Sequence, residues 1–214
     1  MGGRRLSRIG TVIGVLGGTF DPPHIGHLWL ATLAADALDL DRVLLMPAAQ
    51  PPHKRGQPLT SAAIRLQLTA AAVEGDDRLG VSAIELQRPG SSYTVDSLAE
   101  LAREHPDARL VLVMASDQLA VIDTWHEPDH LLAQAEWAVA ERPGFAFPAA
   151  AALRARFGAA AGRIHRLDGP VLDLSSSLIR GRVAAGRAIR YLVPRPVEDL
   201  IEVHGLYRAP IRPA

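Results

Sequence analysis

Residues 17–27 read GGTFDPPHIGH and combine residue types that can bind phosphate. Gly17 and Gly18 allow the backbone to approach an anion closely. His24 and His27 are three positions apart, so both fall on one face of a helix that begins near them, and the free N–H groups at its start also attract anions. Either histidine alone could be a helix cap or a surface residue. Two histidines without an acidic third ligand make only half a metal site, so we predict a triphosphate site and no metal site.

A second segment suited to phosphate lies late in the chain, where residues 174–180 read LSSSLIR. Ser175, Ser176 and Ser177 stand just ahead of an expected helix whose first turn carries Arg180. Hydroxyl groups and free helix N–H groups can hold phosphate oxygens, and a guanidinium adds charge and paired hydrogen bonds. An ordinary serine cap beside a solvated arginine is the alternative. The two segments together predict a two-part phosphate site.

The elements that position these segments can be predicted from hydrophobic periodicity. Apolar runs at 11–16, 42–46, 80–86, 109–114 and 137–140 alternate with stretches of helical spacing at 24–38, 61–73, 91–104, 127–135, 148–157, 175–185 and 196–204, and residues 163–174 are expected to be extended. This order predicts an α/β fold, a Rossmann-like open parallel sheet with helices on both faces and a short C-terminal helical extension. The end of its first strand is where such folds bind phosphate.

The bulk composition excludes several classes of function. The 214 residues are 48% hydrophobic, which fits a single domain over 1–214 with residues 1–10 as a disordered tail. With 23 basic and 23 acidic residues, we expect neither a nucleic acid nor a membrane as partner, and the absence of cysteine excludes disulfides and a cysteine nucleophile. Glycines interrupt the first apolar run, so we predict no signal peptide or membrane span and expect a cytoplasmic protein. Oligomeric state is left open, a homo-oligomer included.

The two segments resemble the paired signatures of the nucleotidyltransferase superfamily, a Gly-Thr-Phe-Asp-Pro stretch with His-x-Gly-His and a late Ile-Ser-Ser-Thr-x-Ile-Arg motif. The tetrapeptide HIGH also marks class I aminoacyl-tRNA synthetases, but their Lys-Met-Ser-Lys-Ser segment is not found here and no room is left for an anticodon domain. Residues 51–54, 88–98, 116–119, 142–144 and 191–194 are similar to the bacterial nicotinate-nucleotide adenylyltransferases, and the resemblance runs from about residue 13 to residue 207.

This resemblance implies transfer of AMP from ATP to nicotinic acid mononucleotide, giving nicotinic acid adenine dinucleotide and pyrophosphate in NAD biosynthesis, with Mg²⁺ carried by ATP. It implies catalytic roles for His24, His27 and Arg180, which would stabilise charge on the leaving pyrophosphate, with His27 protonated. Sister enzymes that use nicotinamide mononucleotide or pantetheine phosphate are alternatives, as is a non-catalytic nucleotide sensor. The residues implied to bind ATP are Gly17, Gly18, Thr19, Phe20, His24, His27, Ser175, Ser176, Ser177 and Arg180.

The resemblance also implies an acceptor site built from the middle of the chain. Trp125 offers an aromatic face to a pyridine ring, although a core or surface tryptophan is the alternative. Asp117 follows a strand, where an acid can hold a ribose hydroxyl. Relatives usually carry glycine where Ala115 stands. The residues implied to bind the mononucleotide are His53, Lys54, Ser92, Tyr93, Thr94, Asp117, Trp125 and Arg142, of which the first two lie in a proline-rich loop over 48–58 and could simply be solvated.

Overall fold

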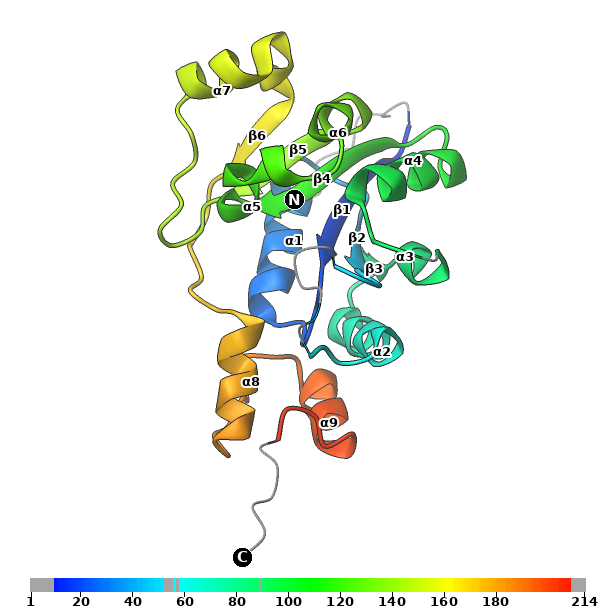
Figure 1. Cartoon of the computed structure of the whole chain (residues 1–214), viewed down its shortest axis with the longest axis vertical. Helices are drawn as coiled ribbons and strands as arrows, with labels where there is room; N and C mark the ends of the chain where they lie inside the picture. Colours follow the sequence, from blue (N-terminus) through cyan, green and yellow to red (C-terminus); the bar gives the residue numbers. More distant parts are fainter. Residues whose placement is uncertain (1–9, 52–55, 57, 89, 209–214) are drawn as a thin grey trace, which may run out of the picture.

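A computed structural model describes residues 10–51, 56, 58–88 and 90–208, so the expected tail lies almost wholly outside the described residues. A six-stranded parallel sheet with the order β3-β2-β1-β4-β5-β6 forms its centre (Figure 1). The chain builds one half outward from β1 and then returns to place β4 on the other side of β1, which creates a crevice at the carboxyl ends of these strands. The strands are β1 (Val12–Gly18), β2 (Arg42–Pro47), β3 (Leu79–Val81), β4 (Arg109–Ala115), β5 (Glu136–Ala140) and β6 (Ile164–Leu167).

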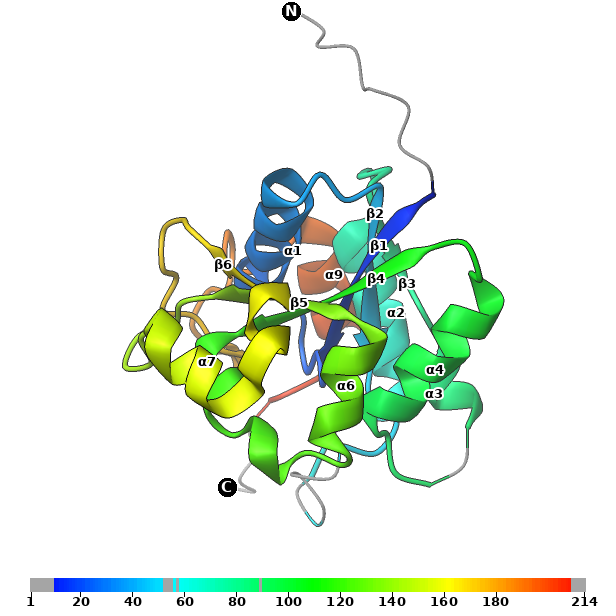
Figure 2. The same ribbon diagram turned by 90° about the horizontal axis from the view of Figure 1, so that it is seen from above.

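Helices cover both faces of the sheet, as the sequence predicted. α1 packs on one face, whereas α4, α6 and α7 lie on the other (Figure 2). No helix in the described ranges has both the length and the apolar character needed to cross a membrane. The helices are α1 (Ile25–Ala37), α2 (Ala62–Val73), α3 (Ile84–Gln87), α4 (Thr94–Glu104), α5 (Ser116–Ala120), α6 (Pro128–Gln134), α7 (Ala150–Phe157), α8 (Ser176–Ala184) and α9 (Arg195–Val203), with 3₁₀ turns η2 (Ile122–Thr124) and η3 (Gly158–Arg163).

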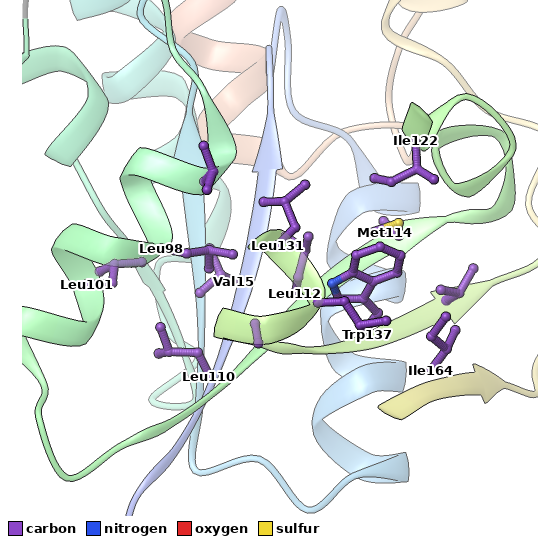
Figure 3. Packing of buried hydrophobic residues seen from close by; sticks show 14 of the residues in the cluster. Val15, Leu98, Leu101, Leu110, Leu112, Met114, Ile122, Leu131, Trp137 and Ile164 are labelled. Carbon is purple, nitrogen blue, oxygen red and sulfur yellow. The ribbon is translucent and has the colours of Figure 1, made fainter. Parts of the chain in front are cut away.

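The strands are apolar on both sides because successive side chains enter different cores. In β1, Val15 belongs to the cluster under α4 and α6, while Leu16 belongs to the cluster under α1. Trp137 of β5 is fully buried in the first of these clusters, beside Leu112 and Met114 of β4 (Figure 3). These two cores fix the strand register and so hold the strand ends that form the crevice.

The predicted C-terminal extension packs on α2 rather than on the sheet. Leu68 of α2, Ile179 of α8 and Val197 of α9 are fully buried in a third apolar cluster. α8 is therefore fixed to the rest of the domain through α2 and α9, and its first residues lie against the turn that follows β1.

Two predicted strands and one helix start differ from the structure. The run at 80–86 is a strand only to Val81, because its pairing with β2 ends at Leu45, and the chain then forms the short helix α3. The segment expected to be extended over 163–174 pairs with β5 only as far as Leu167. The helix expected over 91–104 begins at Thr94, because the hydroxyl of Ser92 accepts hydrogen bonds from another loop.

Candidate functional site

A cleft of about 300 Å³ opens at the carboxyl ends of the strands, where the first turn, the ends of β4 and β5 and the start of α8 meet. Gly17 and Gly18 end β1 immediately before it. The other residues predicted to bind ATP all line this cleft, namely Thr19, Phe20, His24, His27, Ser175, Ser176, Ser177 and Arg180.

Hydrogen bonds join the two predicted phosphate segments directly. Nη1 of Arg180 donates to the carbonyl oxygen of Asp21 at 2.8 Å, across 159 positions of sequence, and Oγ of Ser176 donates to the carbonyl oxygen of Pro22 at 2.8 Å. Ser175 caps α8 by accepting from the Leu178 N–H, which is the ordinary role that the sequence left as an alternative. Nη2 of Arg180 donates to Oγ of Ser177 at 3.1 Å, so the guanidinium is held at the margin of the cleft by both of its Nη atoms. The segments therefore form one site.

The two histidines are stacked at the start of α1. His24 is the N-cap of the helix, and its ring lies 3.7 Å from that of His27, with 25° between the ring planes. Nδ1 of His27 accepts a hydrogen bond from the backbone N–H of His24 at 3.2 Å. A backbone N–H can only donate, so in this geometry the His27 ring carries its proton on Nε2 and is neutral. Nδ1 is therefore an acceptor here, and the protonated His27 implied by the resemblance stays a prediction for the nucleotide complex.

Glycines at two positions of this motif are required by close contacts. A Cβ atom on Gly18 would lie 2.9 Å from the ring of Phe20, which is buried and contacts His27 edge-on. A Cβ atom on Gly26 would lie 3.0 Å from Nδ1 of His24. Side chains at either position would displace the aromatic rings that shape the cleft.

Burial makes His24 a neutral residue over the physiological pH range. Its ring is 5% exposed and its Nδ1 has no hydrogen-bond partner. Burial, reinforced by the charge of Arg142, lowers the pKa of His24 from 6.5 to about 4. The His24 imidazole can therefore form hydrogen bonds to a nucleotide as an uncharged group.

This lowered pKa makes the folding stability dependent on pH. Unfolded His24 takes up a proton below about pH 6.5, whereas folded His24 does so only near pH 4, so its stabilising contribution is complete above pH 6.5 and is lost on acidification. The shift from 6.5 to about 4 corresponds to about 3 kcal/mol of unfolding free energy. Urea titrations at several pH values should show this loss in the wild type and a clearly smaller one in His24→Asn, which keeps a capping side chain. Equal pH dependence of the unfolding free energy in both proteins would contradict this role of His24.

Two of the predicted acceptor residues meet at the rim of the cleft. Nη1 of Arg142 lies 2.9 Å from Oδ2 of Asp117, and the other oxygen of Asp117 accepts from the Gln118 N–H at 3.0 Å. Arg142 lines the cleft, as does Ala115 at the end of β4. The backbone N–H of Arg142 donates to Oγ of the buried Ser116, which holds the β5 end in place. A cation and a carboxylate thus border the phosphate segments.

The remaining predicted acceptor residues that the structure describes do not line this cleft. Oγ of Ser92 accepts from the N–H groups of Ala49 and Gln50, at 2.9 and 3.2 Å. Tyr93 stacks on His126 at 4.3 Å and, like Trp125, packs at the edge of the core cluster under α4 and α6. Thr94 begins α4, the Nε1 of Trp125 is buried without a hydrogen-bond partner, and His53 and Lys54 lie outside the described residues.

Sequence reasoning missed an apolar wall and a buried polar anchor. The wall comes from Trp29, Leu30 and Leu33 of α1, and Trp29 and Leu33 lie directly against Gly169. Nε1 of Trp29 donates to the Pro170 carbonyl oxygen at 3.0 Å. Helical spacing of apolar residues in α1 was visible, but nothing distinguished a cleft wall from core. This wall supplies a surface for a flat ring.

The anchor is Asp21, whose side chain is buried in the first turn. It accepts from the hydroxyl of Tyr207 at 2.6 Å and from the Thr60 N–H at 3.3 Å. Burial and the contact with the Asp21 carboxylate both raise the pKa of the Tyr207 hydroxyl, so that it stays protonated and donates. These contacts fix the turn between Thr19 and His24.

Fold and cleft together define a nucleotide-binding α/β protein of the nucleotidyltransferase type. The model of the family described as "Cytidylyltransferase-like" matches residues 15–182. The chain is 46% identical over 196 residues to a probable nicotinate-nucleotide adenylyltransferase of Thermomicrobium roseum, covering 92% of this chain and 91% of the relative, and 42% identical to the Thermus thermophilus counterpart, covering 92% and 99%. It superposes with a TM-score of 0.76 on the Plasmodium falciparum nicotinic acid mononucleotide adenylyltransferase complexed with NaAD, at 18% identity and covering 92% and 97%.

The chain belongs to the cytidylyltransferase-like family and, within it, to the nicotinate-nucleotide adenylyltransferases. The family and the fold class expected from the sequence are thereby confirmed.

Proposed function

We propose that this protein transfers AMP from ATP to nicotinic acid mononucleotide, releasing pyrophosphate and forming nicotinic acid adenine dinucleotide. The observation that carries this proposal is the meeting of the two phosphate segments in one cleft, where Arg180 and Ser176 bind the backbone of the first turn. The names of the relatives, which share 38–46% of their residues with the chain, give the acceptor.

The cleft offers separate surfaces to the parts of ATP. Its polar side, from His24 and His27 to Ser175–Ser177 and Arg180, suits the triphosphate because it combines neutral donors with one guanidinium. Its apolar wall from Trp29, with Leu30 and Leu33, suits the adenine ring. ATP would then lie with its phosphates at the end of β1.

The acceptor would approach from the β4 and β5 side. Asp117 is placed to hold a ribose hydroxyl, and Arg142 is placed to hold the acceptor phosphate near His24. Tyr93, Thr94 and Trp125 would enclose the pyridine ring. In this arrangement the acceptor phosphate faces the α-phosphorus of ATP.

Chemistry at this site depends on placement and charge. An oxygen of the mononucleotide phosphate attacks the α-phosphorus, the bond from that phosphorus to the β-phosphate oxygen breaks, and pyrophosphate leaves with the electron pair. The acceptor phosphate is already ionised at neutral pH, so no side-chain base is required. Hydrogen bonds from His27 and Arg180 to the departing oxygens strengthen as charge accumulates there.

Magnesium would enter this site bound to the phosphates of ATP. The described residues contain no group of three or more His, Asp or Glu side chains placed to ligate a metal ion, and the Asp21 carboxylate is already bound to Tyr207 and the Thr60 N–H. Mg²⁺ prefers oxygen ligands and is commonly held by phosphates and water. Bound to the triphosphate, it would neutralise phosphate charge while the protein supplies the donors.

A panel of acceptors tests the proposed function. With ATP and Mg²⁺, nicotinic acid mononucleotide should support pyrophosphate release with a kcat/KM at least about tenfold above that of nicotinamide mononucleotide. The reason is that donors placed to bind the ring carboxylate lose hydrogen bonds when an amide replaces that group. Pantetheine phosphate should give no release above background. A preference for either alternative acceptor would identify a sister enzyme, and ATP binding without release for any acceptor would identify a nucleotide sensor.

A further inference from the structure

A buried arginine that does not line the cleft connects the ATP side of the site with the proposed acceptor side. Arg65 of α2 is 1% exposed, and its guanidinium donates to three backbone carbonyl oxygens: Thr19 at 2.8 Å, Thr60 at 3.0 Å and Ala49 at 3.2 Å. Burying a guanidinium is costly unless its donors are satisfied. Burial lowers the pKa of Arg65, while the charges of Asp21 and Glu85 act in the opposite direction. The residue therefore holds the three segments together at some expense to stability.

On the ATP side, Arg65 fixes the turn that follows β1. Thr19 lines the cleft, and its carbonyl oxygen is bound by Nη1 of Arg65. The Thr60 carbonyl oxygen is bound by Nε, while the Thr60 N–H donates to Asp21, whose own carbonyl oxygen accepts from Arg180. Both phosphate segments are thus connected to the Arg65 guanidinium, the first through the Thr19 carbonyl oxygen and the second through the Thr60 peptide and Asp21.

On the acceptor side, Arg65 is connected to the segment before α4 through Ala49. The carbonyl oxygen of Ala49 accepts from Nη2 of Arg65, and its N–H donates to Oγ of Ser92. Ser92 directly precedes Tyr93 and Thr94, which are proposed to enclose the pyridine ring. A single residue, Ala49, therefore separates the Arg65 fork from the acceptor segment.

We propose that Arg65 is a positioning residue that sets the distance between the bound ATP and the bound mononucleotide. This inference rests on the proposed function. Where positioning supplies most of the catalysis, a displacement of about 1 Å can cost about a hundredfold in rate. The planar guanidinium fork binds three divergent carbonyl oxygens at once, whereas a lysine ammonium keeps the charge but cannot reproduce that geometry.

The test compares Arg65→Lys with Leu68→Ala, a core substitution one turn further along α2 that leaves the carbonyl contacts in place. For Arg65→Lys we expect kcat to fall by about 10- to 100-fold. Affinities for ATP alone and for the mononucleotide alone should change by less than about threefold, while affinity for the dinucleotide product, which spans both halves, should fall by about tenfold or more. Leu68→Ala should lower the unfolding temperature yet keep kcat and product affinity within about threefold.

Each outcome decides the proposal when both variants are assayed well below their unfolding temperatures. Wild-type kcat in Arg65→Lys, or equal losses of kcat in both variants at the same folded fraction, would overturn the positioning role and leave the proposed function standing. Equal losses of affinity for the product and for each substrate alone would assign Arg65 to binding and also overturn it. Failure of the wild type to release pyrophosphate would remove the proposed function, and the positioning role with it.

Discussion

Replacing His27 by alanine should lower kcat by at least about a hundredfold while the protein remains folded. His27 lines the cleft at the start of α1, where its Nδ1 accepts from the His24 N–H, and it is one of the side chains proposed to donate to the departing phosphate oxygens. Removing one preorganised donor to developing charge typically costs about 3 kcal/mol of transition-state stabilisation. Steady-state kinetics with saturating ATP and nicotinic acid mononucleotide measure the effect directly.

His105→Ala provides the matched control for that experiment. This histidine caps the exposed end of α4 and does not line the cleft, so its removal should leave kcat within about threefold of wild type. Circular dichroism should show both variants folded. Turnover of His27→Ala within about threefold of wild type would remove His27 from the mechanism.

Replacing Arg180 by alanine should produce a loss of similar or larger size. The side chain brings the charge of α8 to the phosphate cleft and also binds the Asp21 carbonyl oxygen, so its removal takes away a charged donor and loosens the contact between the two phosphate segments. We expect kcat/KM for ATP to fall by about 10²- to 10³-fold, with a smaller rise in KM for the mononucleotide.

Arg182→Ala on the same helix separates these effects from a general loss of α8. Its guanidinium also donates to a backbone carbonyl oxygen, that of Ala188 at 2.8 Å, but it does not line the cleft. Kinetic constants close to wild type are expected for this variant. Comparable losses of kcat/KM in the two variants would show that Arg180 acts only through the stability of α8.

The sequence predicted the sheet and the two segments that meet in the cleft because both depend on local signals. Apolar runs marked β1, β2, β4 and β5 to within a few residues, and residues 17–27 and 174–180 carry their residue types in short stretches. The run at 80–86 was misread because a short apolar stretch is compatible with a strand or with a buried helical turn, and only the pairing with β2 decides between them.

Contacts between distant segments could not be predicted in the same way. Ser92 was expected at the start of the helix over 91–104. Its hydroxyl instead accepts hydrogen bonds from the N–H groups of Ala49 and Gln50, more than forty positions away. Arg65 gave no signal, since an arginine in an amphipathic helix usually faces solvent. Both residues act by joining loops whose proximity is a property of the whole fold.

The bond between Asp21 and Tyr207 has a consequence for how the protein is made. The two residues are 186 positions apart, so on the ribosome the first turn emerges long before the phenol that holds its carboxylate in place. Because β1 also pairs with β2 and β4, the turn that follows it acquires its contacts from segments that are made later. The carboxylate of the first turn therefore gains this partner only after all six strands of the sheet have been synthesised.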